Sequence, residues 1–407
     1  MRDASGEAAP IVIGIVAGEA SGDALAATLI RAVRLRRDDI RFAGIAGPRM
    51  EAEGCEVWGP MERLAVRGFV EVLAHLPWLI ALRRGIARRI IASRIPLFVG
   101  VDAPDFNLGL ERRLKRQGIR TVHFVSPSVW AWRKDRLKTI GAGVDRMLAL
   151  FPFEPRLYED AGIPVTYVGH PMAAAAAGPG TRRSTREVLK QKPATPLFAL
   201  LPGSRLSEVE MHAGLVLDAA ARIVEARPDA QFVVPLVSRT TRDAFVEAQH
   251  RGGHDALPIT LLYGHAADAL RAADVALVAS GTATLEAALA RCPHVIYYRV
   301  SSLTAWIVRR KLLLPWVGLP NVLAGRFVVP EFLQEDATPG NLAQAALNLF
   351  DDTATRRRLE ALFGNFGQRL AADTGALAAD AVLAELGAAP GRRRVPGGPK
   401  VALRIPP

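Results

Sequence analysis

The chain has 407 residues, half of them hydrophobic, and this length favours two domains that each bury a core of their own. The formal net charge of +12 indicates an anionic partner: a nucleic acid, a phosphorylated substrate or a membrane surface. The two cysteines, Cys55 and Cys292, are far apart, which argues against a disulfide framework or zinc site and favours a reducing cytosol. The acidic N-terminus does not match a signal peptide, and no apolar stretch reaches the roughly 18 residues needed to span a bilayer.

Apolar runs alternate with helical patterns in the N-terminal half, which predicts right-handed βαβ units around a parallel sheet. The first run, Ile11–Val16, leads through a Gly-rich turn into a predicted helix from Asp23 to Arg36. Further strands are predicted at Phe42–Ile45, Leu97–Val101, Thr121–Val125 and Met147–Leu150. We therefore assign residues 1–172 to an N-terminal Rossmann-like domain.

The composition changes abruptly after VGHPM, and residues 173–195 are interpreted as an interdomain linker. A second Rossmann-like domain is predicted over residues 196–387. Its strands are expected at Leu197–Leu201, Gln231–Pro235, Thr260–Leu262, Val275–Ala279 and Val295–Tyr298. Residues 388–407 form a basic tail rich in Pro and Gly, which is typical of disorder. Two such domains facing each other would leave a ligand-binding cleft where the carboxyl ends of their strands converge.

No cofactor or metal site is predicted. Gly14, Gly18 and Gly22 do not have the G-x-G-x-x-G spacing of a dinucleotide-binding turn, so NAD binding lacks its main support. No D-x-D pair occurs, and no cluster of His, Cys and Asp has metal-ligand spacing. A diphosphate leaving group would then be neutralised by arginine, helix N-termini and hydroxyl groups.

The segment DVALVASGTATLEAALARCP, residues 274–293, predicts a buried strand, a Ser-Gly-Thr turn and a helix. The start of such a helix presents unpaired N–H groups and the positive end of the helix dipole, which suit a phosphate or diphosphate. Ser280, Gly281, Thr282 and Thr284 would add hydroxyl groups and close backbone approach. The alternative is that these residues only cap a helix in an ordinary α/β unit.

Two further side chains are candidates for binding a nucleotide in the second domain. Arg205, in LLPGSRLSEVE, follows a strand in a Gly-Ser turn, where its guanidinium could form bidentate hydrogen bonds to a diphosphate. An arginine in such a turn, taken alone, is more often a surface residue. Glu286 lies one helical turn into SGTATLE, where its carboxylate could accept both ribose hydroxyls; a capping box does not explain it, because residue 283 is alanine.

A candidate general base lies in the first domain, where GVDAPDFNLGL places Asp102 and Asp105 at a strand end next to Pro104. A carboxylate there could deprotonate an attacking hydroxyl. Asp102 is favoured because it lies nearer the strand, but the sequence leaves the choice open, and Asn107 could be structural.

Two tryptophans, Trp130 and Trp132, lie in the loop FVSPSVWAWRKDRLK beside Arg133 and Lys134. They are either core anchors or the wall of a cleft. His170, in VGHP, fits a structural role better than a catalytic one.

Two segments combine apolar, aromatic and basic residues in the manner of interfacial helices: Leu73–Arg94 and Leu303–Pro320. Each could instead be a core helix with a solvated basic edge. Their joint occurrence predicts peripheral contact with an anionic membrane surface.

Taken together, the motifs resemble the lipid-A-disaccharide synthase family. They run in family order from about residue 11 to residue 335. The motifs are AGEASGD, AGPRM, DAPDFN, SPSVWAWR, FPFEP, VGHP, LPGSR, SGTATLEAAL, LPNVLAGR and PEFLQ. Ile45 and Ala46, where AGPRM begins, depart from the glycine-rich pattern usual in the family.

The resemblance implies a GT-B architecture, in which the second domain holds most of the nucleotide, and an inverting, metal-independent glycosyl transfer in Gram-negative bacteria. It implies that UDP-2,3-diacylglucosamine donates its sugar to 2,3-diacylglucosamine 1-phosphate (lipid X), forming the β-1′,6-linked lipid A disaccharide 1-phosphate and UDP. The enzyme would lie in the cytoplasm, attached peripherally to the inner membrane. A homodimer formed through an exchanged C-terminal segment is an open alternative to a monomer.

The resemblance also implies roles for individual residues. Asp102 would take the proton of the acceptor 6-hydroxyl, Arg205 and the helix start at Ser280–Thr284 would stabilise the departing diphosphate, and Glu286 would hold the ribose. The other residues assigned to substrate binding by their positions in the motifs are Ser21, Trp130, Trp132, Asn321, Glu331 and Gln334.

The sequence is also compatible with two alternative functions. Another UDP-sugar enzyme, such as an undecaprenyl-linked transferase or a sugar epimerase, would use unacylated or different acceptors. A basic, non-catalytic module would bind nucleic acid or anionic lipid, but the arginines are dispersed along the chain, so no nucleic-acid partner is expected.

Overall fold

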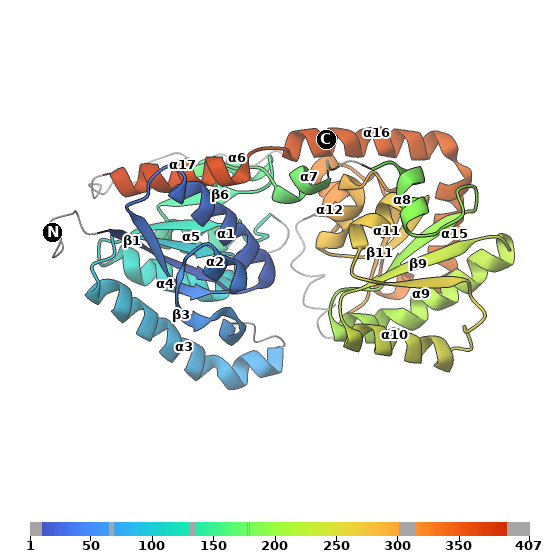
Figure 1. Ribbon diagram of the computed structural model, residues 1–407, viewed down its shortest axis with the longest axis horizontal. Helices are drawn as coiled ribbons and strands as arrows, with labels where there is room; N and C mark the ends of the chain where they lie inside the picture. Colours follow the sequence, from blue (N-terminus) through green and yellow to red (C-terminus); the bar gives the residue numbers. More distant parts are fainter. Residues whose placement is uncertain are drawn as a thin grey trace. The chain divides into compact units, whose positions relative to one another are not determined.

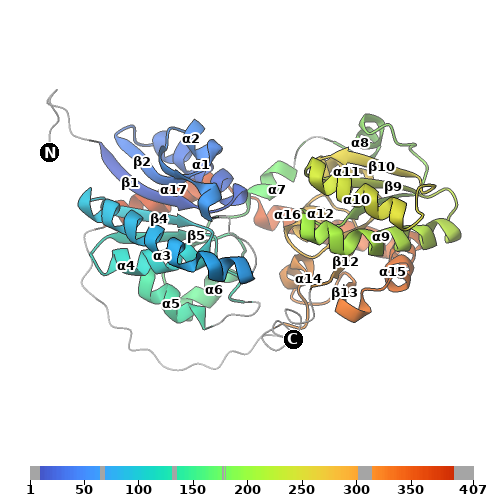
Figure 2. The same ribbon diagram turned by 90° about the horizontal axis from the view of Figure 1, so that it is seen from below.

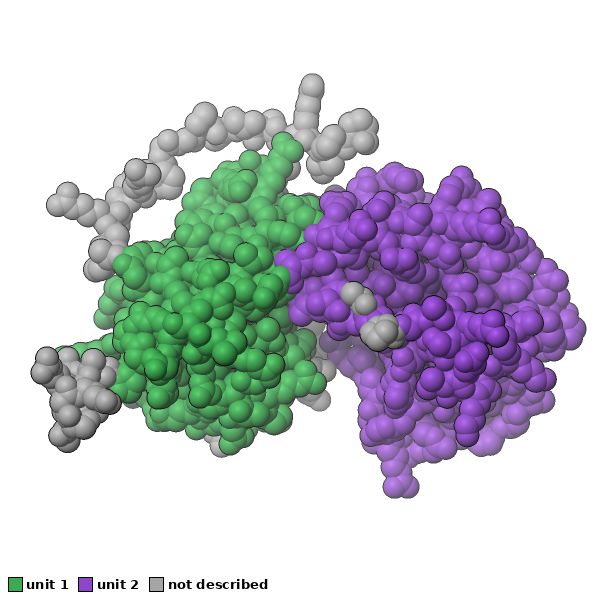
Figure 3. All heavy atoms as spheres, turned by 45° about the horizontal axis from the view of Figure 1, so that its top comes forward, with its two compact units in different colours: residues 1–129, 133–169, 373–407 green, residues 130–132, 170–372 purple. Residues whose placement is uncertain are grey.

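The computed structural model describes residues 10–64, 69–130, 135–176, 178, 180–300 and 314–388. The chain forms two compact units, residues 1–129, 133–169 and 373–407, and residues 130–132 and 170–372 (Figure 3). Each unit has one parallel sheet with helices on both faces (Figures 1 and 2). The predicted fold class, α/β with two Rossmann-like parallel sheets, is confirmed.

The first unit contains a seven-stranded sheet with the order β3-β2-β1-β4-β5-β6-β7. Its strands are β1 (Ile11–Ala17), β2 (Ile40–Ala46), β3 (Glu56–Pro60), β4 (Leu97–Val101), β5 (Arg120–Phe124), β6 (Arg146–Ala149) and β7 (Val165–Tyr167). Its helices are α1 (Ala20–Arg34), α2 (Pro48–Ala52), α3 (Phe69–Ala92), α4 (Pro104–Lys115), α5 (Arg136–Gly143), α6 (Glu154–Glu159) and α17 (Thr374–Gly387), with a 3₁₀ turn at Met61–Leu64.

The first sheet is buried on both faces because its central strands are continuous apolar runs. One face packs against α1 and α17, which lie side by side and contribute alanines and leucines to the core. The other face packs against α3 and α4 through residues such as Ile90, Phe106 and Leu110. The strand order reverses direction between β1 and β4, and ligands of open α/β sheets usually bind at the carboxyl ends of the strands beside such a point.

The second unit contains a six-stranded parallel sheet with the order β10-β9-β8-β11-β12-β13. Its strands are β8 (Leu197–Leu201), β9 (Gln231–Leu236), β10 (Ile259–Tyr263), β11 (Val275–Ala279), β12 (His294–Tyr298) and β13 (Glu331–Leu333). Its helices are α7 (Pro171–Ala176), α8 (Arg182–Val188), α9 (Leu206–Ala226), α10 (Arg239–Arg251), α11 (Ala266–Ala272), α12 (Thr282–Leu289), α14 (Leu319–Ala324), α15 (Pro339–Asp351) and α16 (Thr353–Leu370), with a 3₁₀ turn at Gln334–Asp336.

The structure differs from the predicted domain boundaries at two places. Residues 173–195, expected to be a linker, contain most of α7 and all of α8 and belong to the second unit. The last helix, α17, belongs to the first unit, although the sequence placed it with the second sheet. Residues 389–407 of the predicted tail lie outside the described residues.

A buried glutamate that pairs with two arginines of the sheet explains why α17 joins the first unit. Glu385, near the end of α17, is only 4% exposed. It accepts hydrogen bonds from Arg120 on β5 and from Arg146 on β6, the latter at 2.7 Å from Nε to Oε1. Gly375 at the start of the helix lies against α1, where a Cβ would come 2.9 Å from Thr28 Cγ2. These contacts are tertiary, so helical periodicity alone cannot reveal them.

The structure describes the first of the two segments predicted to be interfacial, but little of the second. Leu73–Arg94 lies mostly in α3, whose Ile86, Ala87 and Ile90 are buried in the core, while Trp78 is 41% exposed. Most of Leu303–Pro320 lies outside the described residues. Among the helices of the described ranges, none combines the length and apolarity that a membrane span requires.

We expect Glu385→Ala to destabilise the protein by about 3 kcal/mol, because Arg146 loses its carboxylate partner and Arg120 keeps only the longer contact to Asp145, at 3.7 Å. Asp380→Ala is the matched control on the same helix. Asp380 pairs with Arg36 but its side chain is 63% exposed, so its loss should change the free energy of unfolding by less than about 1 kcal/mol. Urea unfolding of both variants measures the difference; equal effects would contradict the role of Glu385.

Candidate functional site

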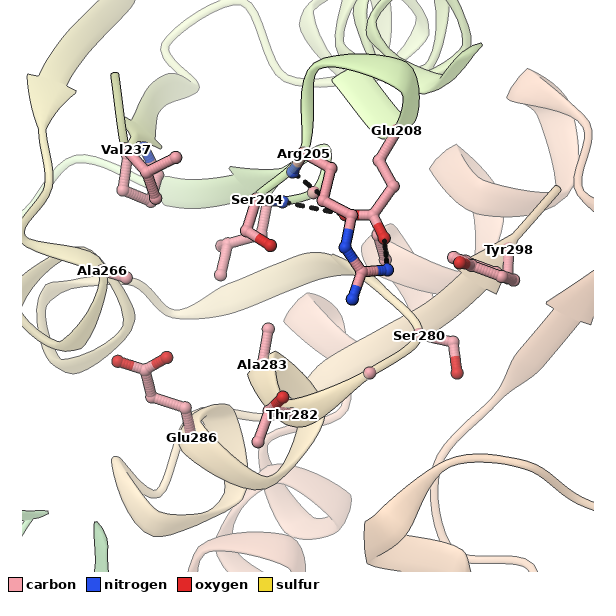
Figure 4. Close-up of a pocket in the computed structure, with 15 residues that line it drawn as sticks. Ser204, Arg205, Glu208, Val237, Ala266, Ser280, Thr282, Ala283, Glu286 and Tyr298 are labelled. Atoms are coloured by element: carbon pink, nitrogen blue, oxygen red, sulfur yellow. Dashed lines mark hydrogen bonds and ion pairs between the residues drawn. The ribbon is translucent and has the colours of Figure 1, made fainter. Parts of the chain in front are cut away.

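A pocket of about 390 Å³ lies at the carboxyl ends of the strands in the second unit (Figure 4). It lies where β8 and β11 are neighbours and the strand order reverses, which is the usual ligand site of an open α/β sheet. The lining residues are Leu201, Gly203, Ser204, Arg205, Glu208, Pro235, Val237, Ala266, Ala279, Ser280, Gly281, Thr282, Ala283, Glu286 and Tyr298. Five of the predicted binding residues are therefore brought together here.

The turn between β11 and α12 forms one wall of the pocket. Gly281 has φ 152° and ψ −158°, a conformation that residues with a Cβ rarely adopt. Ser280, Gly281 and Thr282 face the pocket. Thr284 does not line it, because its side chain is buried and its hydroxyl donates to Gly281 O at 2.8 Å. In this structure Thr284 holds the turn in its conformation, and the other three residues form the wall of the pocket.

The turn between β8 and α9 forms the facing wall. Arg205 is the N-cap residue of α9, and its side chain is 51% exposed. Its Nη1 lies 3.1 Å from Glu208 Oε1, while Glu208 Oε2 accepts hydrogen bonds from the backbone N–H groups of Ser204 and Arg205. Sequence reasoning did not single out Glu208, although a glutamate three residues after the N-cap is the acidic half of a capping box.

The charges of the pocket come from one arginine and two carboxyl groups. Glu286 projects from α12 and Arg205 extends from the opposite wall (Figure 4). Burial raises the pKa of Glu286 above its usual range. Burial, followed by the charge of Glu208, also raises the pKa of Tyr298. The pocket thus offers one guanidinium, several hydroxyl groups and a carboxyl group that can accept hydrogen bonds from a polar ligand.

A buried histidine links the β8–α9 turn to the segment that follows β12. His212, on α9, has its Nδ1 2.9 Å from Pro202 O, in the turn that follows β8. Its Nε2 accepts a hydrogen bond from Arg299 N at 3.1 Å, just after β12, and its ring packs edge-on against Tyr297. His212 therefore fixes the loops that follow two different strands, a role that its position in the sequence does not signal.

Asp102 lies in the first unit, directly after β4. Asp102 and Ala103 both have left-handed backbone conformations, with φ 52° and φ 44°. Such strain in residues with side chains is typical of functional sites. Asp102 N donates to Phe124 O at 2.8 Å, and Asn107 Nδ2 donates to Asp102 O at 2.8 Å. Burial raises the pKa of Asp102 and the charge of Glu19 adds to this increase, whereas a hydrogen bond from the backbone of Ala103 and, after it, the charge of His123 oppose it.

Asp105, the alternative base, has a different environment. Its side chain is 85% exposed and forms an ion pair with Arg136 on α5. Its carbonyl oxygen accepts a hydrogen bond from Arg83 on α3 at 2.8 Å. Asp105 thus differs from Asp102, which is only partly exposed, and which of the two is the base stays a prediction. Asn107 is buried and holds the strand end in place, which agrees with a structural role.

Asn321 and Glu331 form a hydrogen-bonded network in the second unit, and Gln334 contacts a separate backbone segment. Asn321 is fully buried; its Oδ1 accepts from Val328 N and Val329 N, and its Nδ2 donates to Glu331 Oε1 at 2.6 Å. Glu331 also accepts from the backbone N–H groups of residues 317 and 318. The amide of Gln334 contacts the backbone of Val300. In this structure the side-chain polar groups of Asn321 and Glu331 are used to hold loops.

The remaining predicted residues lie at other places. Ser21 is exposed in the first turn of α1, and Trp130 is half-buried. Trp132 lies outside the described residues. His170 is buried, its Nδ1 accepts from Met172 N, and burial lowers its pKa to about 4. In the described part of the chain, no three His, Cys, Asp or Glu side chains lie close enough together to hold a metal ion.

Comparison with known proteins identifies the family. The model of the lipid-A-disaccharide synthetase family matches residues 13–381. A lipid-A-disaccharide synthase from Chromobacterium violaceum is 52% identical over 371 residues, which are 91% of this chain and 96% of that protein. One from Pseudomonas syringae pv. syringae is 49% identical over 94% of this chain and 99% of that protein. The chain belongs to the lipid-A-disaccharide synthetase family. It is therefore a glycosyltransferase, as the motifs predicted.

Solved structures confirm the GT-B fold of this family member. A putative UDP-N-acetylglucosamine 2-epimerase from Listeria monocytogenes aligns with a TM-score of 0.56 at 14% identity, covering 93% of this chain and 95% of that chain. MurG from Acinetobacter baumannii aligns with a TM-score of 0.54 at 15% identity, covering 92% and 99%. At such low identity, these two likenesses concern the fold alone.

We expect Asn321→Ala to lower the free energy of unfolding by about 2–4 kcal/mol, because Val328 N and Val329 N lose their acceptor and Glu331 loses a donor. The control is Asn341→Ala, whose exposed amide donates to Asp336 O at 2.8 Å; this variant should lose less than about 1 kcal/mol. Thermal and urea unfolding distinguish the two. A fully stable Asn321→Ala protein would show that the network is not structural.

Proposed function

We propose that this chain transfers 2,3-diacylglucosamine from UDP-2,3-diacylglucosamine to 2,3-diacylglucosamine 1-phosphate, forming a β-1′,6-linked disaccharide 1-phosphate and UDP. The family match over residues 13–381 carries this proposal, because the pocket alone would suit many sugar nucleotides. The geometry of two sites supports it. One is a polar pocket at the strand ends of the second unit, and the other is Asp102, which has a left-handed backbone conformation at a strand end of the first unit.

In the proposed reaction, Asp102 accepts the proton of the acceptor 6-hydroxyl as its oxygen attacks C1 of the donor sugar. The bond between C1 and the β-phosphate oxygen breaks, and its electron pair leaves with UDP. Attack on the face opposite the leaving group inverts the configuration at C1. The raised pKa of Asp102 supports this role, since a more basic carboxylate is a better proton acceptor once it is ionised.

The donor would be held by the pocket of the second unit. Arg205 and the N–H groups at the start of α12 supply positive charge for the diphosphate, which grows more negative as the bond to C1 breaks. Glu286 would accept hydrogen bonds from the ribose hydroxyls. Since these protein groups provide the neutralising charge, we propose that turnover needs no metal ion, and activity in EDTA should equal activity in its absence.

We also propose that the chain works at the cytoplasmic surface of the inner membrane, because both substrates carry acyl chains. The exposed arginines of α3 and the exposed Trp78 support contact with an anionic lipid surface. Binding to vesicles that contain anionic lipid, but not to neutral vesicles, tests this assignment. The molecular mass of the protein in solution tests whether the active form is a monomer or a dimer.

We expect Asp102→Asn to lower kcat by a factor of about 10² to 10⁴, because the amide cannot accept the hydroxyl proton. Asp105→Asn should remain within a fewfold of the wild-type rate, since Asp105 is solvated and paired with Arg136. UDP release from both lipid substrates in detergent micelles measures this, with UDP affinity as a check on folding. A large loss in Asp105→Asn with a small one in Asp102→Asn would reverse the assignment.

We expect Arg205→Ala to weaken UDP binding by about tenfold to a hundredfold, the loss for one or two charge-assisted hydrogen bonds. Arg239→Ala is the matched control, because Arg239 begins α10, is 91% exposed and does not line the pocket. Calorimetric titration with UDP measures both variants. Equal affinities for wild type and Arg205→Ala would place the diphosphate elsewhere.

A further inference from the structure

A second cavity in the second unit, of about 640 Å³, is lined by four arginines. We call it the arginine cavity. Arg182 on α8, Arg271 on α11, Arg291 just after α12 and Arg357 on α16 line it, and Glu360 is the one acidic residue among the described residues that do so. The four helices belong together, since α11 packs against α8 and α12, and α12 packs against α16 (Figure 1). Four guanidinium groups against one carboxylate make the cavity positive, and such a cavity attracts anions.

The arginine cavity is separate from the pocket at the strand ends. Thr282 and Glu286, in the first part of α12, line that pocket, whereas Leu289, the last residue of the helix, lines the arginine cavity. The eight residues of α12 span about 12 Å. No described residue lines both. A ligand in the arginine cavity would therefore occupy a different site from the sugar nucleotide.

Two of the four arginines have carboxylate partners. Arg182 Nη2 donates to Glu360 Oε1 at 2.8 Å, and its Nη1 lies 3.8 Å from Asp274 Oδ1. Its buried Nε has no hydrogen-bond partner among the described residues. Arg271 Nη1 lies 3.3 Å from Asp268 Oδ1. These carboxylates leave the charges of the other two arginines unbalanced.

Arg291 and Arg357 are exposed, and in the part of the chain that the structure describes neither side chain forms an ion pair or hydrogen bond. The Arg291 guanidinium lies against α16, where a Cβ on Gly364 would come 3.5 Å from its Cζ, Nε and Nη2. Both guanidinium groups therefore keep their donors available to a ligand in the cavity.

Interaction with helix ends does not account for these arginines. Arg271 lies in the last turn of α11 and Arg291 follows the end of α12, where positive side chains interact with the helix dipole. Within the described ranges, however, neither side chain donates to a carbonyl group of its helix end. Arg291 also has a left-handed backbone with φ 55°, at a position after a helix where glycine is usual. Arginine is less favourable there than glycine, which is consistent with a role for its side chain.

We propose that the arginine cavity binds a phosphate group, either of a soluble phosphate ester or of an anionic lipid head group. Guanidinium groups recognise phosphate oxygens through paired, charge-assisted hydrogen bonds. The volume of the cavity is typical of small-molecule sites, so it leaves room for more than a single ion. The inference goes beyond the proposed function and does not depend on it, because no residue of the proposed reaction lines this cavity.

A smaller cavity, of about 190 Å³, adjoins the arginine cavity, and Ala176, Leu289 and Arg291 line both. Phe363 and Gly367 of α16 also line it, so this part is largely apolar. An apolar cavity beside a positive one fits a phosphate ester with an apolar group. Lipid head groups are therefore tested separately from soluble phosphate.

Calorimetric titration of the full chain with pyrophosphate tests the proposal. The parent protein is Arg205→Ala, which removes the guanidinium from the other pocket. We expect Arg291→Gly and Arg357→Gln each to weaken pyrophosphate binding by about tenfold, the loss for one charge-assisted hydrogen bond. Both positions are exposed, and glycine suits the left-handed backbone of residue 291, so urea unfolding should show intact folds.

Arg358→Gln is the matched control. It removes the same charge from α16, but Arg358 donates to Thr355 Oγ1 at 2.8 Å and does not line the cavity. Its affinity should stay within about twofold of the parent, because solvent and salt screen a remote exposed charge. Unchanged affinity in Arg291→Gly and Arg357→Gln, an equal loss in Arg358→Gln, or no pyrophosphate binding to the parent would overturn the proposal.

Vesicles of phosphatidylcholine, with and without phosphatidylglycerol, identify the source of the phosphate. Weaker binding of Arg291→Gly and Arg357→Gln to phosphatidylglycerol vesicles, with competition by pyrophosphate, supports a lipid head group. Wild-type vesicle binding in variants that have lost pyrophosphate binding supports a soluble phosphate ester. Neither titration contains a sugar substrate, so a failure of the proposed transfer reaction would leave these outcomes unchanged.

Discussion

The candidate sites depend on one constraint: where two neighbouring parallel strands lead into helices on opposite faces of their sheet, unpaired backbone N–H groups and side chains collect at one edge. In the second unit this happens between β8 and β11, whose residues pair in register from Phe198 to Leu201. In the first unit it happens between β1 and β4. The edge in the second unit forms a polar pocket, and the edge in the first unit carries Asp102.

In the proposed reaction the two edges have opposite electrostatic tasks, and their local backbones differ accordingly. At the second unit's edge, Glu208 accepts the N–H groups of Ser204 and Arg205 and pairs with the arginine, so the turn is ordered by an anion of the chain itself. A bound diphosphate would have to share Arg205 with this carboxylate. At the first unit's edge, the strained Asp102 backbone is fixed by Asn107 and by the next strand. Precise placement of a base needs such rigid support.

Local patterns predicted much of this arrangement, because buried parallel strands and helix starts leave short-range signals. The strand at Leu197–Leu201 and the turn at Ser280–Thr282 followed from apolar runs and turn residues, whereas the choice of Asp102 as the base stays a prediction. The missing parts depend on residues far apart in sequence. Glu385 meets Arg120 across 265 positions, so the pattern of α17 could not show which sheet it covers. Asn321 and Glu331 were recognised only as positions in a motif, and their bonding to loops required coordinates.

A buried pair on α4 and β5, Glu111 and His123, illustrates why such features escape sequence reasoning. In the sequence, Glu111 follows an apolar helical pattern and precedes two arginines, so it reads as a residue of a solvated helix face. Its burial arises because Gly100 leaves room on the sheet directly beneath it. A glycine within a buried strand is unfavourable for the strand, and here it permits a carboxylate to reach an imidazole. Stability is lowered at three points, in the glycine, in the buried pair and in the left-handed Asp102, and all three lie within one strand end and the helix that covers it.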